Sequence, residues 1–153
     1  MRKRVIEDNP STPPPASDFW LDLDALAEVE ISSEDPAQLI EGALLPGGSG
    51  WRAGTPGRQQ IRLLFTRPQS LRRIRLQFVE TSESRTQEFI LRWSADKGGT
   101  TYREIVRQQW NFSPDGSTVE DEDLSVELDG VTRLELLLTP DIADSQAVAS
   151  LAK

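Results

Sequence analysis

Apolar and polar residues alternate in short runs along most of the chain, and this period of two restricts the fold more than any other feature. The clearest run places Ile61, Leu63 and Phe65 on one face. The same spacing recurs at 74–78, 89–93, 124–128 and 134–138. Successive side chains of a β-strand point to opposite faces, so each run predicts a strand with one buried face and one wet face.

Turn residues separate these runs. Glycine, proline and aspartate cluster at 96–99, 113–117 and 129–130, where they favour reversals of the chain. Further strands are expected near 29–31 and 148–152, and a change of phase within 101–112 predicts a break before Trp110. The only short helix is expected within 36–44. The sequence therefore predicts an all-β fold, an antiparallel β-sandwich or jelly roll of about eight strands with one short helix.

The chain of 153 residues is long enough for one domain. Prolines at positions 10, 13, 14 and 15 predict a flexible tail. Asp18 resembles a helix N-cap, and Phe19 and Trp20 after it predict a segment that docks on the domain or, alternatively, binds a partner. We expect residues 1–26 to form the proline-rich tail and docking segment, and residues 27–153 to form the domain.

Composition excludes several function classes. A net charge of −8 disfavours general affinity for nucleic acid or anionic membranes. The chain contains neither cysteine nor histidine, which removes the commonest zinc ligands and the commonest general base. The basic start at 1–4 is followed by acids and prolines rather than an apolar core, unlike a signal peptide. We expect a soluble, cytoplasmic protein with no membrane segment.

The remaining carboxylates do not predict an enzyme. They concentrate at 120–123, where adjacent side chains point to alternate faces and cannot converge on one substrate. We expect this acidic run to be a solvated edge that discourages aggregation.

Several segments resemble a known family. Ile31-Ser32-Ser33-Glu34, Ile40-Glu41-Gly42, Trp51 and Gln59-Gln60-Ile61-Arg62-Leu63 are similar to the opening of the discoidin domain, also called the coagulation factor 5/8 type C domain. The segment 89–102 resembles its middle strands, and 149–152 resembles its closing strand. The resemblance implies the galactose-binding-like jelly roll.

Members of that family are mostly non-catalytic modules that bind sugars, phospholipid head groups or proteins through loops at one end of the sandwich. The resemblance places the glycine-rich loop with Trp51 and Arg52 at that end. Many members carry a structural calcium, for which Glu34, Asp35 and Glu41 are the candidates here. Apart from such a calcium we expect no cofactor.

Sugar binding needs an aromatic platform and polar side chains that hydrogen-bond hydroxyl groups. The residues that offer these groups on or beside loops are Trp51, Arg52, Arg58, Arg85, Trp110 and Asn111. Arg85 is expected in a loop at 81–87, together with Gln87. The alternative for both tryptophans is a place in the core, which is where Trp93 is expected.

Charge is uneven along the chain. Residues 58–79 hold six arginines and no acid, whereas residues 115–144 hold ten acids and one arginine. Arg62, Arg73 and Arg75 either form a basic strip for an acidic partner or pair with acids on the adjoining strand. The favoured function is carbohydrate binding, and the alternative is a protein-interaction or assembly domain without a sugar ligand.

Overall fold

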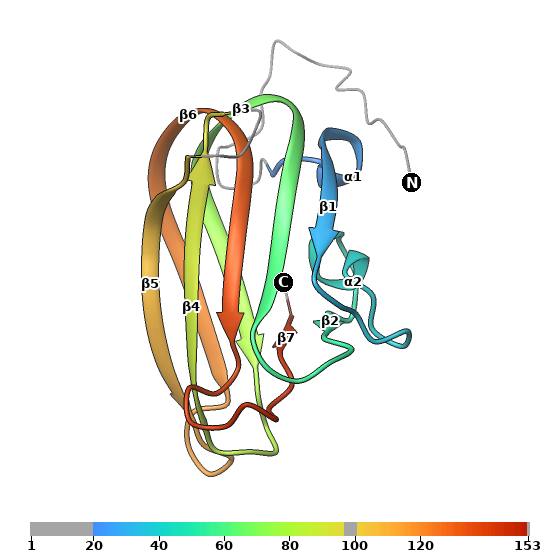
Figure 1. Cartoon of the computed structure of the whole chain (residues 1–153), viewed down its shortest axis with the longest axis vertical. Coiled ribbons are helices and arrows are strands. Elements are labelled where there is room, and N and C mark those ends of the chain that lie inside the picture. The colour runs from blue at the N-terminus through green and yellow to red at the C-terminus, as the bar shows by residue number, and fades with distance from the viewer. Residues whose placement is uncertain (1–19, 97–100, 153) are drawn as a thin grey trace.

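Two long strands run through both layers of a β-sandwich and join them (Figure 1). They are β3 (Gln59–Val79) and β6 (Val119–Thr139), which pair antiparallel along their length. Their register shifts between Leu64 and Arg73, where both strands bend over the same end of the molecule. Gly130 sits at the bend of β6 with φ 69°, a conformation that glycine adopts without a steric penalty. The computed structural model describes residues 20–96 and 101–152.

The first layer has five strands in the order β1-β3-β6-β4-β5. The strands not yet introduced are β1 (Ala27–Ile31), β4 (Arg85–Ser94) and β5 (Arg103–Phe112). All neighbours are antiparallel, and β1 and β5 form the two edges.

The second layer is built from the other halves of the long strands, residues 71–79 and 119–128. Two short strands extend it, β2 (Trp51–Arg52) and β7 (Ser150–Leu151), which pair with each other. Directly after β7, the Ala152 amide donates a hydrogen bond to the Gln77 carbonyl of β3 at 2.8 Å. This bond joins the β2-β7 pair to β3. The expected antiparallel sandwich is confirmed.

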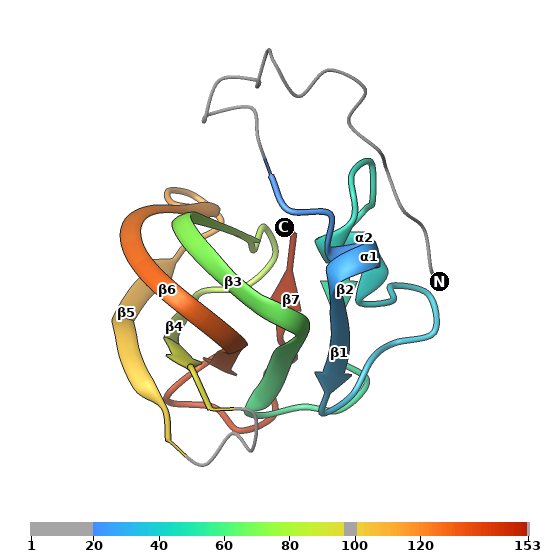
Figure 2. The same ribbon diagram turned by 90° about the horizontal axis from the view of Figure 1, so that it is seen from above.

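Two one-turn helices, α1 (Leu23–Leu26) and α2 (Glu41–Leu44), lie beside β1 (Figures 1 and 2). The helix expected within 36–44 is present as α2, and α1 is a second short helix in addition to it. Leu21 and Leu23 pack against the core, whereas residues 1–19 of the expected tail lie outside the described part. None of the helices described is long or apolar enough to cross a membrane.

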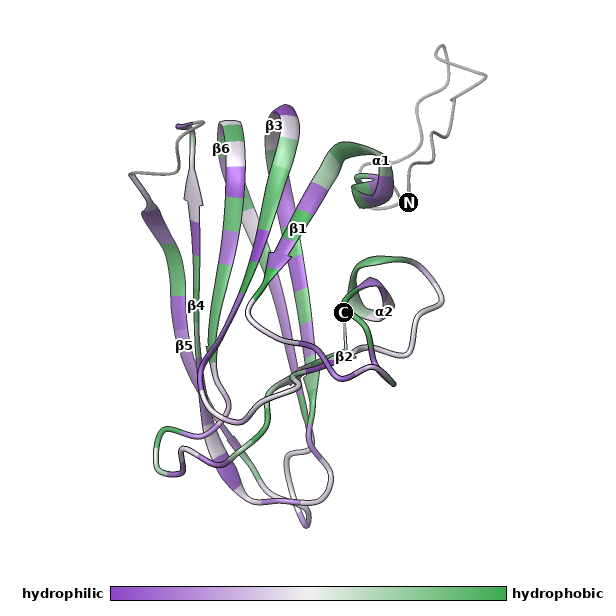
Figure 3. Ribbon diagram, turned by 45° about the vertical axis from the view of Figure 1, so that its right-hand side comes forward, coloured by the Kyte–Doolittle hydropathy of each residue, from purple (hydrophilic) through white to green (hydrophobic). Residues whose placement is uncertain are grey.

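The core lies between the layers, and the hydropathy of the strands alternates along them accordingly (Figure 3). Phe78 of β3 and Phe89 of β4 meet there from opposite layers, with ring centroids 5.4 Å apart and planes tilted by 32°. The period-two pattern thus predicted the buried face of both strands correctly.

Two local expectations are wrong. No break precedes Trp110, because β5 runs unbroken to Phe112. The change of phase instead reflects a register shift opposite Leu91 and Arg92, where β5 holds one extra residue. The expected loop at 81–87 is also shorter, since β4 begins at Arg85 and turns the side chains of Arg85 and Gln87 into the sandwich.

The glycine-rich loop packs on itself. The Gly50 amide donates to the Gly42 carbonyl at 2.9 Å, and a Cβ at Gly42 would lie 2.5 Å from the Gly50 oxygen. A Cβ at Gly48 would lie 2.2 Å from the Gly42 oxygen. Gly42 and Gly48 need to be glycine because a side chain there would collide with the backbone of the same loop. The close packing of this loop fixes the position of Trp51.

Candidate functional site

Three connecting segments meet at the lower end of the sandwich in Figure 1, which we call the loop end. They are residues 80–84, 113–118 and 140–149. Backbone hydrogen bonds fix the longest of them. Ile142 N donates to Thr86 O at 2.9 Å, and Gly57 N donates to Ala147 O at 2.8 Å, which fastens the loop at 53–58 along it.

Arg85 supports the loop end from inside. Its side chain is buried, and Nη1 donates to the Val148 carbonyl at 2.9 Å. Its guanidinium lies 3.8 Å from the Glu80 carboxylate and 5.7 Å from the centre of the Phe112 ring. Arg85 therefore holds the segment 140–149 in place and offers little surface to a ligand.

The charges around Arg85 are mixed. Burial lowers the pKa of its guanidinium, and Arg52 lowers it further, whereas Glu80, Glu83 and Asp141 raise it. Arg52 is thus close enough to repel Arg85. Three acids and one further arginine therefore surround Arg85.

Two arginines near this end of the sandwich, Arg52 and Arg58, are exposed. The side chains of Arg52 and Arg58 form no hydrogen bond or ion pair with any described residue. Both arginines flank the loop that packs along residues 147–149. Of the arginines expected at the site, these two are available to an external ligand.

Asn111 stands apart from them on β5. Its Oδ1 accepts a hydrogen bond from Thr86 Oγ1 at 2.6 Å, which leaves its amide nitrogen facing solvent. Thr86 also anchors Ile142, whose side chain is 52% exposed. The sequence analysis missed Ile142, since a single isoleucine between aspartates gives no signal.

The two candidate tryptophans are buried wholly or in part, and each donates a hydrogen bond within the domain. Trp51 is 1% exposed, and its Nε1 donates to the Ser33 carbonyl at 3.1 Å. Trp110 is half-buried against the core, and its Nε1 donates to Ser117 Oγ at 3.0 Å. Trp51 therefore has no face to present to a sugar ring, and the core alternative describes it.

A buried polar pair lies inside the sandwich above the loop end. The Gln87 amide donates to Glu120 at 3.1 Å. Burial and the neighbouring Glu122 raise the pKa of the Glu120 carboxyl to about 8, so it is mostly protonated at neutral pH. The expectation that residues 120–123 form a solvated acidic edge is wrong for Glu120, which faces inward.

The calcium candidates do not form one donor set. Glu34 Oε2 accepts a hydrogen bond from Ile40 N at 3.1 Å, which caps the start of α2, and Asp35 Oδ1 accepts from Ala37 N at 2.9 Å. Glu41 is exposed on α2. Within residues 20–96 and 101–152, no group of three or more acidic side chains is arranged to hold a metal.

The arginine strip is divided, and two of its three arginines, Arg62 and Arg73, form ion pairs. Arg62 and Arg73 lie in different layers because β3 bends between them. Arg73 makes two hydrogen bonds to Asp123, at 2.8 and 2.6 Å. The alternative that acids on adjoining strands match these arginines is correct for this pair.

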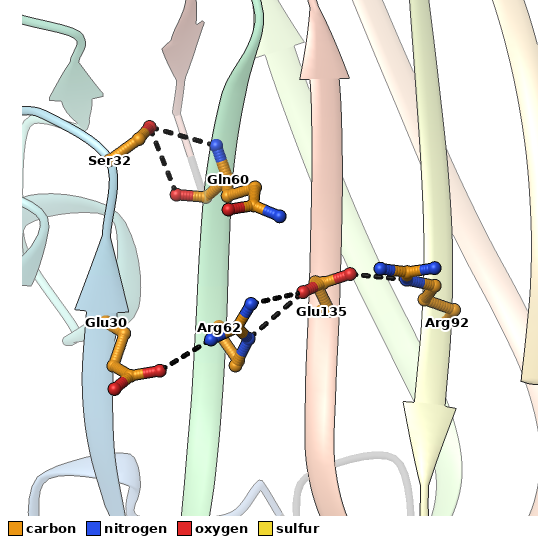
Figure 4. Close-up of polar contacts among 6 residues, drawn as sticks. All are labelled: Glu30, Ser32, Gln60, Arg62, Arg92 and Glu135. Carbon is orange, nitrogen blue, oxygen red and sulfur yellow. Dashed lines mark hydrogen bonds and ion pairs between the residues drawn. The ribbon is translucent and has the colours of Figure 1, made fainter. Parts of the chain in front are cut away.

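Arg62 belongs to a row of alternating charge that crosses all five strands of the first layer. The register aligns Glu30, Arg62, Glu135, Arg92 and Glu104. Figure 4 shows Glu135 between the two arginines and Arg62 reaching Glu30 at 2.7 Å. We call this the charge row, and it ends in a glutamate at both edges of the sheet.

Comparison with known proteins identifies the fold. Neither a family model nor a curated protein sequence matches the chain. Solved structures do match it, and those described next are carbohydrate-binding modules.

A pectin-binding carbohydrate-binding module is 16% identical, with a TM-score of 0.56 over 83% of this chain and 86% of its own. The family 32 module CpGH89CBM32-4 from Clostridium perfringens, in complex with GlcNAc-α-1,4-galactose, is 13% identical, with a TM-score of 0.60 over 90% and 93%. The family 32 module of AlyQ, in complex with 4,5-unsaturated mannuronic acid, is 16% identical, with a TM-score of 0.54 over 82% and 94%. These similarities confirm the galactose-binding-like β-sandwich.

Proposed function

We propose that this domain is a non-catalytic carbohydrate-binding module that takes an acidic sugar chain at the loop end. The observation that carries the proposal is the pair of exposed arginines, Arg52 and Arg58, which have no ion-pair partner in the described part of the chain. A guanidinium matches the geometry of a carboxylate and donates two parallel hydrogen bonds to it. A uronate sugar supplies such a carboxylate.

The other candidate residues take supporting roles. Arg85 positions the segment 140–149 through Val148. Asn111 has a free amide donor for a hydroxyl group, and Ile142 adds an exposed apolar contact beside it. Trp51 holds the loop from within the core.

This arrangement favours recognition by charge and hydrogen bonds over stacking on an aromatic ring. Exposed ion pairs contribute only up to about 1 kcal/mol each, so a single sugar unit should bind weakly. Several units along a chain would add their contributions. We therefore expect a polymer to bind more tightly than a monosaccharide.

The structural neighbours support a sugar ligand of this class. One is described as pectin-binding and another as a complex with an unsaturated mannuronic acid. The absence of histidine and cysteine from the chain, and the complete burial of Glu120 away from solvent, support a non-catalytic role.

Calorimetric titration with oligogalacturonate and with a neutral galacto-oligosaccharide of equal length tests the proposal. We expect the acidic ligand to bind more tightly, and Arg52→Ala with Arg58→Ala to reduce its affinity by about tenfold, from two lost ion pairs. Arg67→Ala is the matched control, because Arg67 lies at the bend of β3, away from the loop end, and its exposed side chain forms no hydrogen bond or ion pair with any described residue. Equal binding of both sugars, or an equal loss in the control, would contradict the proposal.

Titrations with and without calcium test the metal candidates at the same time. Because Glu34, Asp35 and Glu41 do not converge, we expect calcium to leave both stability and affinity unchanged. A calcium-dependent rise in melting temperature would contradict this expectation and indicate that these three residues bind calcium.

A further inference from the structure

A groove lies along β1, an edge strand of the first layer. Figure 2 shows β1 on the side of the molecule away from β5. The volume of the groove is about 560 Å³, and it lies between β1 and the two short helices. Most of its lining is apolar, and its charged residues are all acidic. The residues that line it include Val29, Ile31, Ile40, Leu44, Glu28 and Glu41.

The strand beside this groove has an unpaired edge. Among the described strands, β1 pairs with β3 alone. Ser32 N donates to Gln60 O at 3.0 Å, so the alternation of an antiparallel ladder turns the backbone groups of Val29 and Ile31 away from β3. Within the described residues no hydrogen bond reaches these groups. Unpaired edges of this kind accept a further strand.

The two faces of β1 differ in what they offer such a strand. Val29 and Ile31 are on the inward face with the apolar lining, and Glu28 and Glu30 are exposed on the outward face. A strand added beside β1 alternates in the same way. Its inward side chains therefore need to be apolar.

The charge row indicates which outward side chains an added strand needs. Charges alternate along the row, and Glu30 is its last member at this edge (Figure 4). Opposite charges on neighbouring strands stabilise a sheet, whereas like charges destabilise it. The next strand in the row should therefore carry lysine or arginine.

We propose that the β1 edge is a docking site for an extended peptide segment of a partner protein in which apolar and basic residues alternate. The segment adds as a sixth strand, its apolar side chains enter the groove and its basic side chains pair with Glu28 and Glu30. The other sheet edge does not offer this, because β5 exposes Arg103 and Arg107 as well as Glu104. The docking site lies apart from the loop end and is independent of sugar binding.

The first experiment uses the synthetic peptide acetyl-Val-Lys-Val-Arg-Val-Lys-amide and the isotope-labelled full chain. We expect amide chemical shifts to move at Val29 and Ile31 and hydrogen exchange of both amides to slow by about tenfold or more, as one new hydrogen bond forms at each. Shifts confined to β5 or to the loop end, or no binding at millimolar peptide, would overturn the proposal.

A second experiment separates strand addition from simple charge attraction without altering the protein. Methylating the peptide nitrogens that face β1 should abolish binding, whereas methylating the alternate nitrogens should preserve it, because only the former donate to the sheet. Equal effects of both methylation patterns would argue against an added strand.

Charge variants complete the test. Glu28→Lys should weaken the peptide by about fivefold or more, because an attractive neighbour becomes a repulsive one. Glu127→Lys, an exposed change of the same charge on the second layer, is the matched control and should leave affinity unchanged. Both variants alter exposed side chains, so neither should affect folding.

Discussion

The side-chain amide of Gln87 donates a hydrogen bond to Glu120 across the interior of the sandwich, and both side chains are completely buried. One residue comes from β4 in the first layer, and the other begins β6 in the second. The contact therefore joins the two layers through a polar pair above the loop end. Its strength depends on the proton that Glu120 carries.

Stability should fall as pH rises above the usual carboxyl range. The folded-state pKa of Glu120 is raised from 4.5 to about 8, so between these values the folded state holds a proton that the unfolded state has lost. Rising pH then favours the unfolded state by about 1.4 kcal/mol per pH unit until Glu120 ionises near pH 8. Urea unfolding from pH 5 to 9 measures this slope.

Glu120→Gln is the variant that isolates the effect, because glutamine has no proton to lose. Its free energy of unfolding should vary less with pH than that of the unmodified domain. Asp121→Asn, which removes the next carboxyl from the exposed face, is the control and should keep the original slope. Parallel pH profiles for the unmodified domain and Glu120→Gln would show that Glu120 is not the titrating group.

Glu135→Gln should destabilise the domain strongly. Glu135 is fully buried beneath Arg62 and Arg92, and its loss leaves both guanidinium groups without their shared partner. We expect a loss of about 3 kcal/mol by urea unfolding. Asp129→Asn removes the partner of Arg72 at an exposed pair and should cost less than about 1 kcal/mol. Similar losses of unfolding free energy in the two variants would mean that Glu135 stabilises the fold no more than an exposed ion pair does.

Trp51→Ala should destabilise the fold by about 3–5 kcal/mol, the usual cost of a large cavity in a core. Thermal unfolding followed by circular dichroism measures the loss. Trp20→Ala is the control, because Trp20 is 46% exposed and its ring packs under the Arg73 guanidinium on the surface rather than in the core. A stable Trp51→Ala variant that fails to bind sugar would instead return Trp51 to the binding site.

Gly42→Ala should destabilise the glycine-rich loop by about 2 kcal/mol or more, because the new methyl group would lie 2.5 Å from the Gly50 carbonyl oxygen. Gly116→Ala meets only Ser113, at 3.8 Å or beyond, and should change stability by less than about 0.5 kcal/mol. Urea unfolding of both variants compares them directly. Equal free energies of unfolding for the two variants would show that the loop shifts to accommodate the added methyl group.

Most of the sandwich could be predicted from alternation alone. The runs around Ile61, Phe89 and Leu136 are inward-facing strands as expected, since burial of one face imposes the period of two. The start of β4 escaped prediction because Arg85 and Gln87 are polar and still face inward. Their burial is tolerable because each side chain has a hydrogen-bond partner far away in the sequence, Val148 for Arg85 and Glu120 for Gln87, and sequence spacing does not reveal such partners.

The candidate site was harder to predict than the fold. Arg52 and Arg58 were expected on or beside loops. Arg58 ends the loop at 53–58, Arg52 lies beside that loop in β2, and both are exposed. Trp51 follows a glycine in the same loop, and its direction depends on how closely Gly42 and Gly50 approach each other. That approach is a tertiary contact, so residue type alone could not decide between a place in the core and a place in the site.

The segment 113–118 has a consequence for engineering. Its turn closes on itself, with Ser113 N donating to Ser117 O at 2.8 Å and Gly116 N donating to Ser113 O at 3.0 Å. The loop at 53–58 and the segment 140–149, in contrast, are fastened to each other and to β4. New recognition sequences grafted between Ser113 and Ser117 would therefore leave the rest of the scaffold intact, which makes this tip the natural insertion point for altering specificity.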